Sequence, residues 1–152
     1  MRKFALSLAA LLCFLPAMAQ NTLNDNPDSI IGEYYIHDKS GDSKVRFTRN
    51  SDGTYNCQVT WVKNAIDPET GQPWLDYRNP DKSLRTRRTD SIVIIEGLKY
   101  NAEKKQWDGA KIYDPVRGIR ANVTCMFLPD GSFQLRGTVL GIGEKSIWKK
   151  LN

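Results

Sequence analysis

The sequence predicts an all-β fold, an eight-stranded antiparallel up-and-down β-barrel, on three observations. Apolar and polar residues alternate in short stretches, as in 55–61, where Tyr55, Cys57 and Val59 share one face. Tight-turn residues such as Asp52-Gly53 separate these stretches, and no segment has the apolar period of a long helix. Consecutive strands joined by hairpins form an antiparallel sheet, which can close on itself and remove both edges. A two-sheet sandwich is the structural alternative.

The expected strands are short, rich in β-branched and aromatic residues, and bounded by Gly, Asp, Asn and Pro. In chain order they are expected at 32–36, 44–48, 55–61, 92–95, 107–113, 119–127, 133–139 and around 147–151. The turns between them are expected at 39–42, 50–53, 99–105, 114–118, 129–131 and 141–143. Only the connection between the third and fourth strands is long.

That connection, 64–89, is polar but carries signals of order. Asn79, Pro80 and Asp81 resemble an N-cap, a first-turn proline and a first-turn acid, which predicts a short helix at 82–87. Trp74, Leu75, Tyr77 and Leu84 are apolar enough to pack the segment onto the barrel. Because long loops in compact domains are usually functional or disordered, we expect an ordered flap across one barrel end.

The first 19 residues have the pattern of a secretory signal peptide. Arg2 and Lys3 precede an apolar run at 4–15, and Ala17-Met18-Ala19 is a cleavage box. The run is too short to span a bilayer, and the alternatives are a retained anchor or a lipoprotein. The expected organisation is a signal peptide at 1–19, a flexible polar leader at 20–29 and one barrel domain at 30–152, with no transmembrane segment after cleavage. The mature protein is expected in the periplasm or outside the cell.

Composition and charge narrow the function classes. The chain is 40% hydrophobic and 26% charged, which excludes a disordered tail, collagen and a multi-pass membrane protein. Removing the first 19 of the 152 residues removes two of the 22 basic residues and none of the 17 acidic ones, so the net charge falls from +5 to +3. A mildly basic exported protein is not expected to bind nucleic acid.

No catalytic constellation is evident. His37 is the only histidine, which argues against a Ser-His-Asp hydrolase and a multi-histidine metal site, and it is expected to be a surface residue. The carboxylates of the turns are interpreted as turn and cap residues; these are Asp67, Asp76, Asp81 and Asp114. We therefore expect no catalytic residue, no metal and no cofactor.

Two cysteines follow the predicted cleavage site. Cys57 and Cys125 occupy apolar positions of the third and sixth strands, so both are expected to face the interior. These strands are not neighbours in a meander barrel, and a disulfide needs Cα atoms within about 7 Å. Two buried free thiols are favoured, and the oxidising compartment keeps a disulfide as the alternative.

Three groups of motifs carry a family resemblance. They are Trp61-Val62-Lys63, Asp67-Pro68, Gly71, Pro73, Asp76, Asn79-Pro80-Asp81, Leu84-Arg85 and Arg87; Gly97-Leu98, Trp107, Gly109, Ile112-Tyr113-Asp114-Pro115 and Gly118; and Leu135-Arg136-Gly137, Gly141 and Trp148. With the signal peptide, this combination resembles the secreted bacterial proteins of the DUF2147 family, from Ile31 to the C-terminus. The resemblance implies a lipocalin-like, calycin-type barrel and no established activity. The lipocalin pattern of Gly-x-Trp and a late arginine is replaced here by Gly32-Glu33-Tyr34 and by Lys149 or Lys150.

Candidate ligand-binding residues are the aromatic and polar members of these motifs. They are Trp61, Lys63, Asn79, Arg85, Arg87, Trp107, Tyr113, Arg136 and Trp148. The tryptophans either line a pocket or fill the core, because eight-stranded barrels do both. The polar residues either orient a ligand at the barrel mouth or anchor the flap.

These observations lead to two candidate functions, and an enzyme is the third candidate because no acid–base pair is evident. The first is a barrel that holds a small apolar or anionic amphipathic molecule, with 64–89 as its lid. The second is a solid barrel whose flap meets a cell-envelope protein, with Trp74 and Tyr77 as exposed anchors. The basic cluster of the flap suits an anionic headgroup, a sugar acid or a lipid phosphate, or else forms ion pairs with Asp76 and Asp81; it comprises Lys82, Arg85, Arg87 and Arg88.

Overall fold

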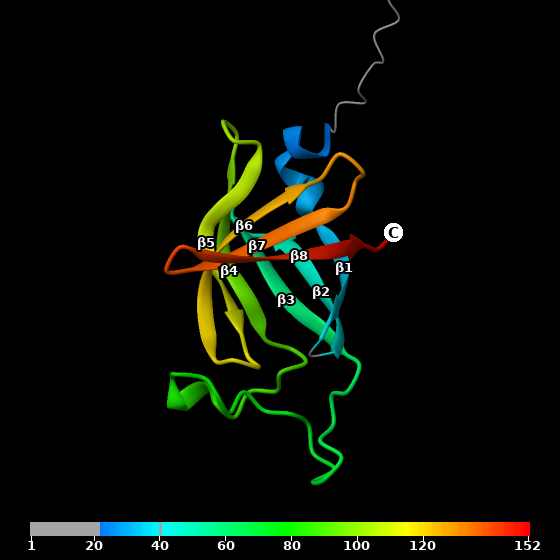
Figure 1. The fold of residues 1–152 in the computed structure, drawn as a ribbon, viewed down its shortest axis with the longest axis vertical. Helices are drawn as coiled ribbons and strands as arrows, with labels where there is room; N and C mark the ends of the chain where they lie inside the picture. The colour runs from blue at the N-terminus through cyan, green and yellow to red at the C-terminus, as the bar shows by residue number, and fades with distance from the viewer. Residues whose placement is uncertain (1–21, 40) are drawn as a thin grey trace, which may run out of the picture.

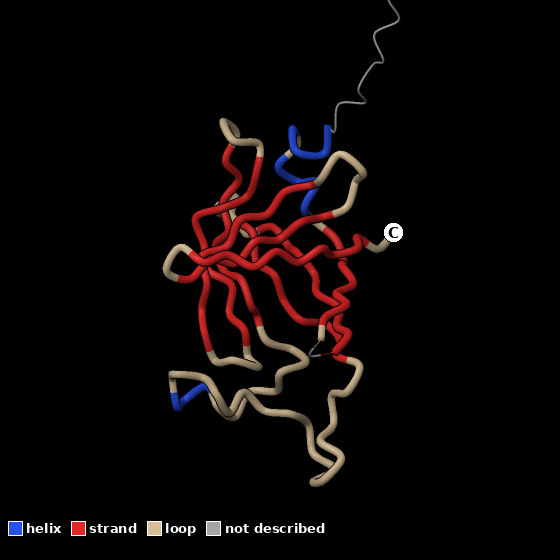
Figure 2. Tube along the Cα trace, viewed as in Figure 1, coloured by secondary structure: helices blue, strands red, loops and turns tan. Residues whose placement is uncertain are grey.

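Eight antiparallel strands follow one another around a closed barrel in the computed structural model, which describes residues 22–39 and 41–152 (Figures 1 and 2). They are β1 (Gly32–Asp38), β2 (Gly41–Arg49), β3 (Tyr55–Val62), β4 (Val93–Asn101), β5 (Gln106–Asp114), β6 (Ile119–Phe127), β7 (Phe133–Val139) and β8 (Ile142–Lys150). Each strand pairs with the next in the chain, and β8 pairs with β1. The predicted up-and-down barrel is confirmed.

The expected signal peptide at 1–19 lies outside the described residues. Among the described residues, no helix has the length and apolarity to cross a membrane.

Aromatic side chains fill one half of the barrel interior. Tyr34, Phe47, Phe133 and Trp148 contact one another, with ring centroids 4.8–6.5 Å apart. Phe127 and Trp107 continue the cluster towards β5. Each of these rings is buried, and edge-on and tilted contacts of this kind add to the free energy gained by apolar burial. This half of the barrel is a packed core.

The two cysteines lie in the same core. Cys57 on β3 and Cys125 on β6 are fully buried free thiols. Burial raises the pKa of both thiols well above the ordinary value, because a thiolate would lose its hydration there. The inward orientation predicted from the alternating pattern is confirmed.

The expected flexible leader, 20–29, is folded from Thr22 onward. Two 3-10 turns, η1 (Thr22–Asp25) and η2 (Pro27–Ile30), close the barrel end at the top of Figure 1. Asn24 is buried, donates its Nδ2 to the Phe127 carbonyl oxygen and accepts from the Phe127 N–H at Oδ1. The Trp107 indole donates to the Pro27 carbonyl oxygen at 3.1 Å. A polar sequence therefore forms a plug, because the Asn24 amide bonds both backbone groups of Phe127 at the end of β6.

The junction of β1 and β8 is the shortest in the barrel. Only Tyr34↔Lys150 and Tyr35↔Lys149 are paired there, whereas β1 and β2 pair at seven positions. Lys150 bends inward, so that its Nζ lies 5.8 Å from the Tyr34 and Phe127 ring centroids and donates to the Ser29 carbonyl oxygen. Of the two lysines at the end of β8, Lys150 is therefore the one whose ammonium group reaches the core.

The flap, 64–89, runs below the other barrel end (Figure 1) and is almost entirely loop (Figure 2). Its helix is the single 3-10 turn η3 (Lys82–Leu84), shorter than the predicted 82–87. Its N-cap is Asp81, whose side chain accepts from the Ser83 N–H, and the cap is not Asn79 as expected. Asn79 instead forms the turn that precedes η3: its Oδ1 accepts from the Asp81 N–H, and its Nδ2 donates to Asp76.

Candidate functional site

A buried carboxylate fastens the flap to the barrel wall. Asp76 is completely buried and accepts hydrogen bonds from the Tyr113 hydroxyl at 2.5 Å, Asn79 Nδ2 at 2.7 Å and Arg87 Nη2 at 3.1 Å. Tyr113 belongs to β5, and the other three residues belong to the flap. We call Asp76, Asn79, Arg87 and Tyr113 the flap anchor.

The flap anchor has the electrostatics of a structural joint. Burial raises the pKa of Tyr113 to about 12, and the hydrogen bond to Asp76 contributes in the same direction. The phenol is therefore protonated at neutral pH and serves only as a donor. Arg87 supplies the compensating charge, which a buried carboxylate requires.

Backbone contacts extend this joint. Arg85 Nε donates to the Asn79 carbonyl oxygen at 2.8 Å. The turn between β5 and β6 rests on the flap at Gly118, whose φ is +69°, and a Cβ there would overlap the Arg78 carbonyl oxygen. Of the predicted ligand residues, Asn79, Arg85, Arg87 and Tyr113 therefore converge, and their contacts hold the flap in place.

A pocket of about 570 Å³ lies in the other arm of the flap. Its lining residues are Lys63, Asn64, Ala65, Ile66, Pro68 and Trp74, and we call it the flap pocket. Two short pairings hold its walls together, a bridge between Ile66 and Pro73 and the Trp74 N–H donating to the Ala65 carbonyl oxygen at 3.0 Å. The Trp74 side chain is 40% exposed although it belongs to an ordered ribbon.

The charged edge of the flap pocket is Lys63. Its Nζ lies 3.4 Å from Asp42 Oδ2, and the same carboxylate accepts from His37 Nδ1 at 2.6 Å. Hydrogen bonds from Tyr35, His37 and Lys63 lower the pKa of Asp42, so it is ionised at neutral pH. His37 is exposed, in agreement with its interpretation as a surface residue.

The remaining predicted site residues lie apart. Trp61 is 40% exposed, like Trp74, but it does not line the flap pocket. Lys44 Nζ lies over its ring, 5.7 Å from the ring centroid. Trp107 and Trp148 belong to the packed core, where a ligand would have to displace other rings to reach them. Arg136 lies on the outer face of β7 against Gly143 of β8. The nine predicted residues therefore do not form one site.

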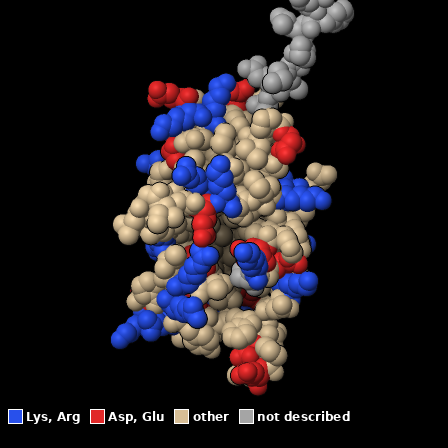
Figure 3. All heavy atoms as spheres, in the orientation of Figure 1, with Lys and Arg blue, Asp and Glu red and all other residues tan. Residues whose placement is uncertain are grey.

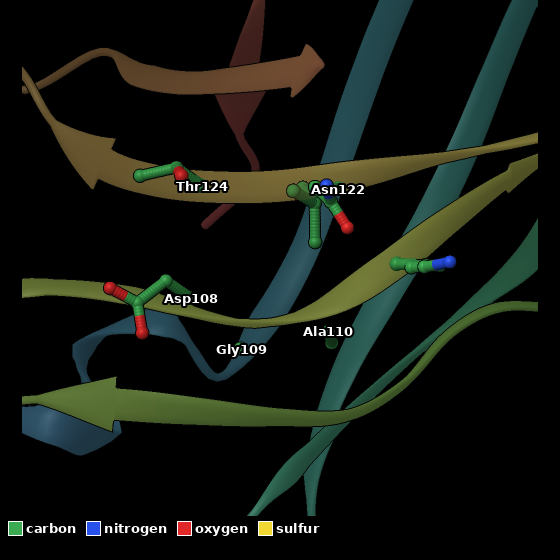
Figure 4. Close-up of a pocket in the computed structure, with 7 residues that line it drawn as sticks. Asp108, Gly109, Ala110, Asn122 and Thr124 are labelled. Atoms are coloured by element: carbon green, nitrogen blue, oxygen red, sulfur yellow. The ribbon is translucent and has the colours of Figure 1, made fainter. Parts of the chain in front are cut away.

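A second pocket, of about 400 Å³, lies on the wall formed by β5 and β6 (Figure 4). It follows a bulge at Gly109, where the register of the two strands shifts between Trp107 and Ala110. Its acidic residue, Asp108, already accepts from Gln106 and Asn101. No aromatic residue lines it, and we assign it no function.

Within 22–39 and 41–152, no group of three His, Cys, Asp or Glu residues could hold a metal ion.

Comparison with known proteins places the chain among bacterial barrels. The family model described as "Uncharacterized protein conserved in bacteria (DUF2147)" matches residues 32–150. A similar solved structure is that of protein HP1028 from Helicobacter pylori, described as belonging to the lipocalin family. Its TM-score is 0.64 at 21% sequence identity, over 81% of this chain and 83% of that one, which supports a shared fold. No curated protein matched.

Proposed function

This chain belongs to the DUF2147 family of bacterial proteins, and we propose that it is an exported, non-enzymatic binding protein that takes a small amphipathic ligand in the flap pocket. Its lipocalin-like barrel is a fold that can bind ligands. The signal-like sequence at 1–19 supports export. The proposal places the ligand beside the barrel mouth instead of in the lumen.

The observation that carries the proposal is the flap pocket itself. Its volume of about 570 Å³ is in the range of small-molecule sites. Trp74 and Ile66 supply apolar surface that the fold leaves exposed, at 40% and 49%, although both residues are ordered. The half of the barrel next to η1 and η2, in contrast, is filled by aromatic side chains that are at most 3% exposed.

The lining also supports a ligand with an anionic end. Lys63 and Asn64 are the polar members of the lining, and Lys63 is its only charged one. The ion pair between Lys63 and Asp42 is long, at 3.4 Å, and the Lys63 side chain is 60% exposed, so the ammonium group remains able to bind a second anion. A molecule with a flat apolar part and a sulfonate, carboxylate or phosphate fits this chemistry.

Titration with 8-anilinonaphthalene-1-sulfonate, an amphipathic anion, tests the proposal. We expect saturable binding to the native protein, weakened at least about tenfold by Trp74→Ala, because burial of a large aromatic side chain is lost. Trp61→Ala is the matched control, since Trp61 is equally exposed but does not line the pocket. Equal loss in both variants, or none in Trp74→Ala, would contradict this site.

A protein partner at the flap is the second candidate, supported by the 60% exposure of Tyr77 on the ordered flap. Tyr77 does not line the flap pocket. Tyr77→Ala should therefore leave the dye titration unchanged and weaken capture of an envelope protein by the purified chain. Capture that survives Tyr77→Ala would argue against this candidate.

A further inference from the structure

The hairpin that joins β7 to β8 ends in an apolar tip. Val139, Leu140 and Ile142 are exposed, Leu140 by 98% and Ile142 by 79%, and Gly141 completes the turn. We call residues 139–142 the hairpin tip; it projects at the left of the molecule in Figure 1 and is an uncharged protrusion in Figure 3. Contiguous exposed apolar side chains of this kind mark interaction sites on soluble proteins.

The backbone of the hairpin tip makes its leucine unexpected. Leu140 and Gly141 have φ values of +49° and +82°, and they form the two-residue connection between the paired Val139 and Ile142. Such turns favour Asn-Gly, because an amide side chain tolerates the left-handed region and leucine does not. Leu140 is thus in an unfavourable conformation and, at 98% exposure, almost entirely in solvent, so the fold itself gains nothing from its side chain.

A basic surface lies directly beside the hairpin tip. It consists of Lys111, Arg120, Arg136 and Lys145 on the outer faces of β5–β8, and we call these four residues the basic collar. Lys145 is paired directly opposite Arg136, a like-charge arrangement that costs stability. Within the described chain none of the four forms an ion pair.

Acidic neighbours lie only on the β4 and β5 side of the basic collar. The register of these strands puts Glu96 opposite Lys111, and Asp108 lines the same pocket as Lys111. Towards β6–β8 the row mates are uncharged: Asn122, Thr124, Thr138 and Gly143. Glu144 at the start of β8 is bound by Arg117 Nη1 at 3.1 Å and lies on the opposite face of the strand from Lys145. The Arg136 guanidinium instead lies over Gly143, where a Cβ would be 2.6 Å from Nε. Arg136 and Lys145, the collar residues on the two strands of the hairpin, therefore present positive charge next to the apolar tip.

We propose that the hairpin tip and the basic collar dock this protein on an anionic lipid surface. The tip enters the boundary between headgroups and acyl chains, and the collar binds the phosphates around it. Charge complementarity distinguishes this surface from the exposed residues of the flap, where Ile66 has Asp67 and Glu69 as close neighbours in the chain. The site does not involve the flap pocket and does not depend on the proposed ligand.

Vesicle flotation tests the proposal, with equal parts of phosphatidylglycerol and phosphatidylcholine in one population and phosphatidylcholine alone in the other. We expect binding to the anionic vesicles and little to the zwitterionic ones. Leu140→Asn should weaken binding at least about tenfold, since one buried leucine is lost from the boundary. Lys145→Glu should weaken it at least about fivefold, because each basic residue near an anionic surface contributes that much.

Matched controls keep the test decisive. Leu140→Asn suits the local backbone, so it should fold, and thermal unfolding verifies this. Ile66→Asn makes the same change on the flap, and Lys104→Glu makes the same charge change at the exposed turn between β4 and β5; both should bind like the parent protein. Equal binding to both vesicle populations, no binding to either, or a loss in Ile66→Asn without one in Leu140→Asn would overturn the proposal. Binding of a protein in place of lipid would appear as no flotation.

Discussion

Removing the Tyr113 hydroxyl takes a hydrogen bond from a completely buried carboxylate. Asp76 is completely buried, so Tyr113→Phe loses a donor at 2.5 Å and leaves one lone pair uncompensated. Hydrogen bonds to charged groups contribute about 1.5–3 kcal/mol, and we expect a loss of about 2 kcal/mol in the free energy of unfolding. For a domain of this size the melting temperature should fall by roughly 6 °C.

The pair can be isolated by a double-mutant cycle. Asp76→Ala should cost about 3–4 kcal/mol, because Arg87, Asn79 and the Tyr113 hydroxyl all lose their acceptor. In the double variant the phenol is absent as well, so the two losses should not add. We expect a coupling free energy of about 1.5 kcal/mol or more between the two positions.

Urea unfolding followed by tryptophan fluorescence measures all four proteins. Tyr55→Phe is the matched control, because its hydroxyl also donates to an aspartate, Asp28, at 2.7 Å, but that carboxylate is partly solvated. Its loss should be under about 1 kcal/mol. Purely additive losses in the Tyr113–Asp76 cycle, or equal losses in Tyr113→Phe and Tyr55→Phe, would refute the reasoning that burial makes the flap anchor strong.

Three further predictions follow from the backbone and from the phenols. Gly118→Ala should cost about 3 kcal/mol in urea unfolding, because it combines a left-handed φ with overlap on the Arg78 carbonyl; a cost below about 1 kcal/mol would mean that the flap yields there. Leu140→Gly should raise the free energy of unfolding by about 1 kcal/mol, and a lower value would show that the leucine side chain stabilises the fold. Burial raises the pKa of Tyr113 and of Tyr55 to about 12 in the folded protein, so these tyrosines ionise first in the unfolded chain. Their contribution to the free energy of unfolding should be constant below pH 10 and fall from pH 10 to 12, with no tyrosinate absorbance from either residue before the fall.

The fold could be predicted from the sequence because its signals are local. Alternation through Tyr55, Cys57 and Val59 fixes which side of β3 is buried, and Asp52-Gly53 fixes the turn before it. The strand boundaries are predicted less well, since β4 continues to Asn101 and the sequence predicts a turn from residue 99. Polar residues in exposed strand positions give the same sequence signal as a turn.

The candidate site could be predicted only in part because its contacts are long-range. In the sequence Asp76 is one loop carboxylate among several, and Asp67 and Asp81 do cap turns as expected. What distinguishes Asp76 is the approach of Tyr113 from another strand, 37 positions away, which no local pattern encodes. The extent to which side chains fill the lumen likewise depends on how rings such as Trp107 pack together in three dimensions.

The short pairing between β1 and β8 has a kinetic consequence. Apart from β3 and β4, which the flap separates, the other strand pairs are hairpins, so a growing sheet can add them one at a time at a small cost in loop entropy. The contacts of Tyr34 and Tyr35 with Lys150 and Lys149 instead join opposite ends of the domain and offer two paired positions in return. The hydrogen bond from Lys150 Nζ to the Ser29 carbonyl oxygen of η2 also forms only when β1 and β8 meet. Closure of this seam is therefore the slow step expected of a barrel with high contact order, and substitutions there should act on the rate of folding as strongly as on its equilibrium.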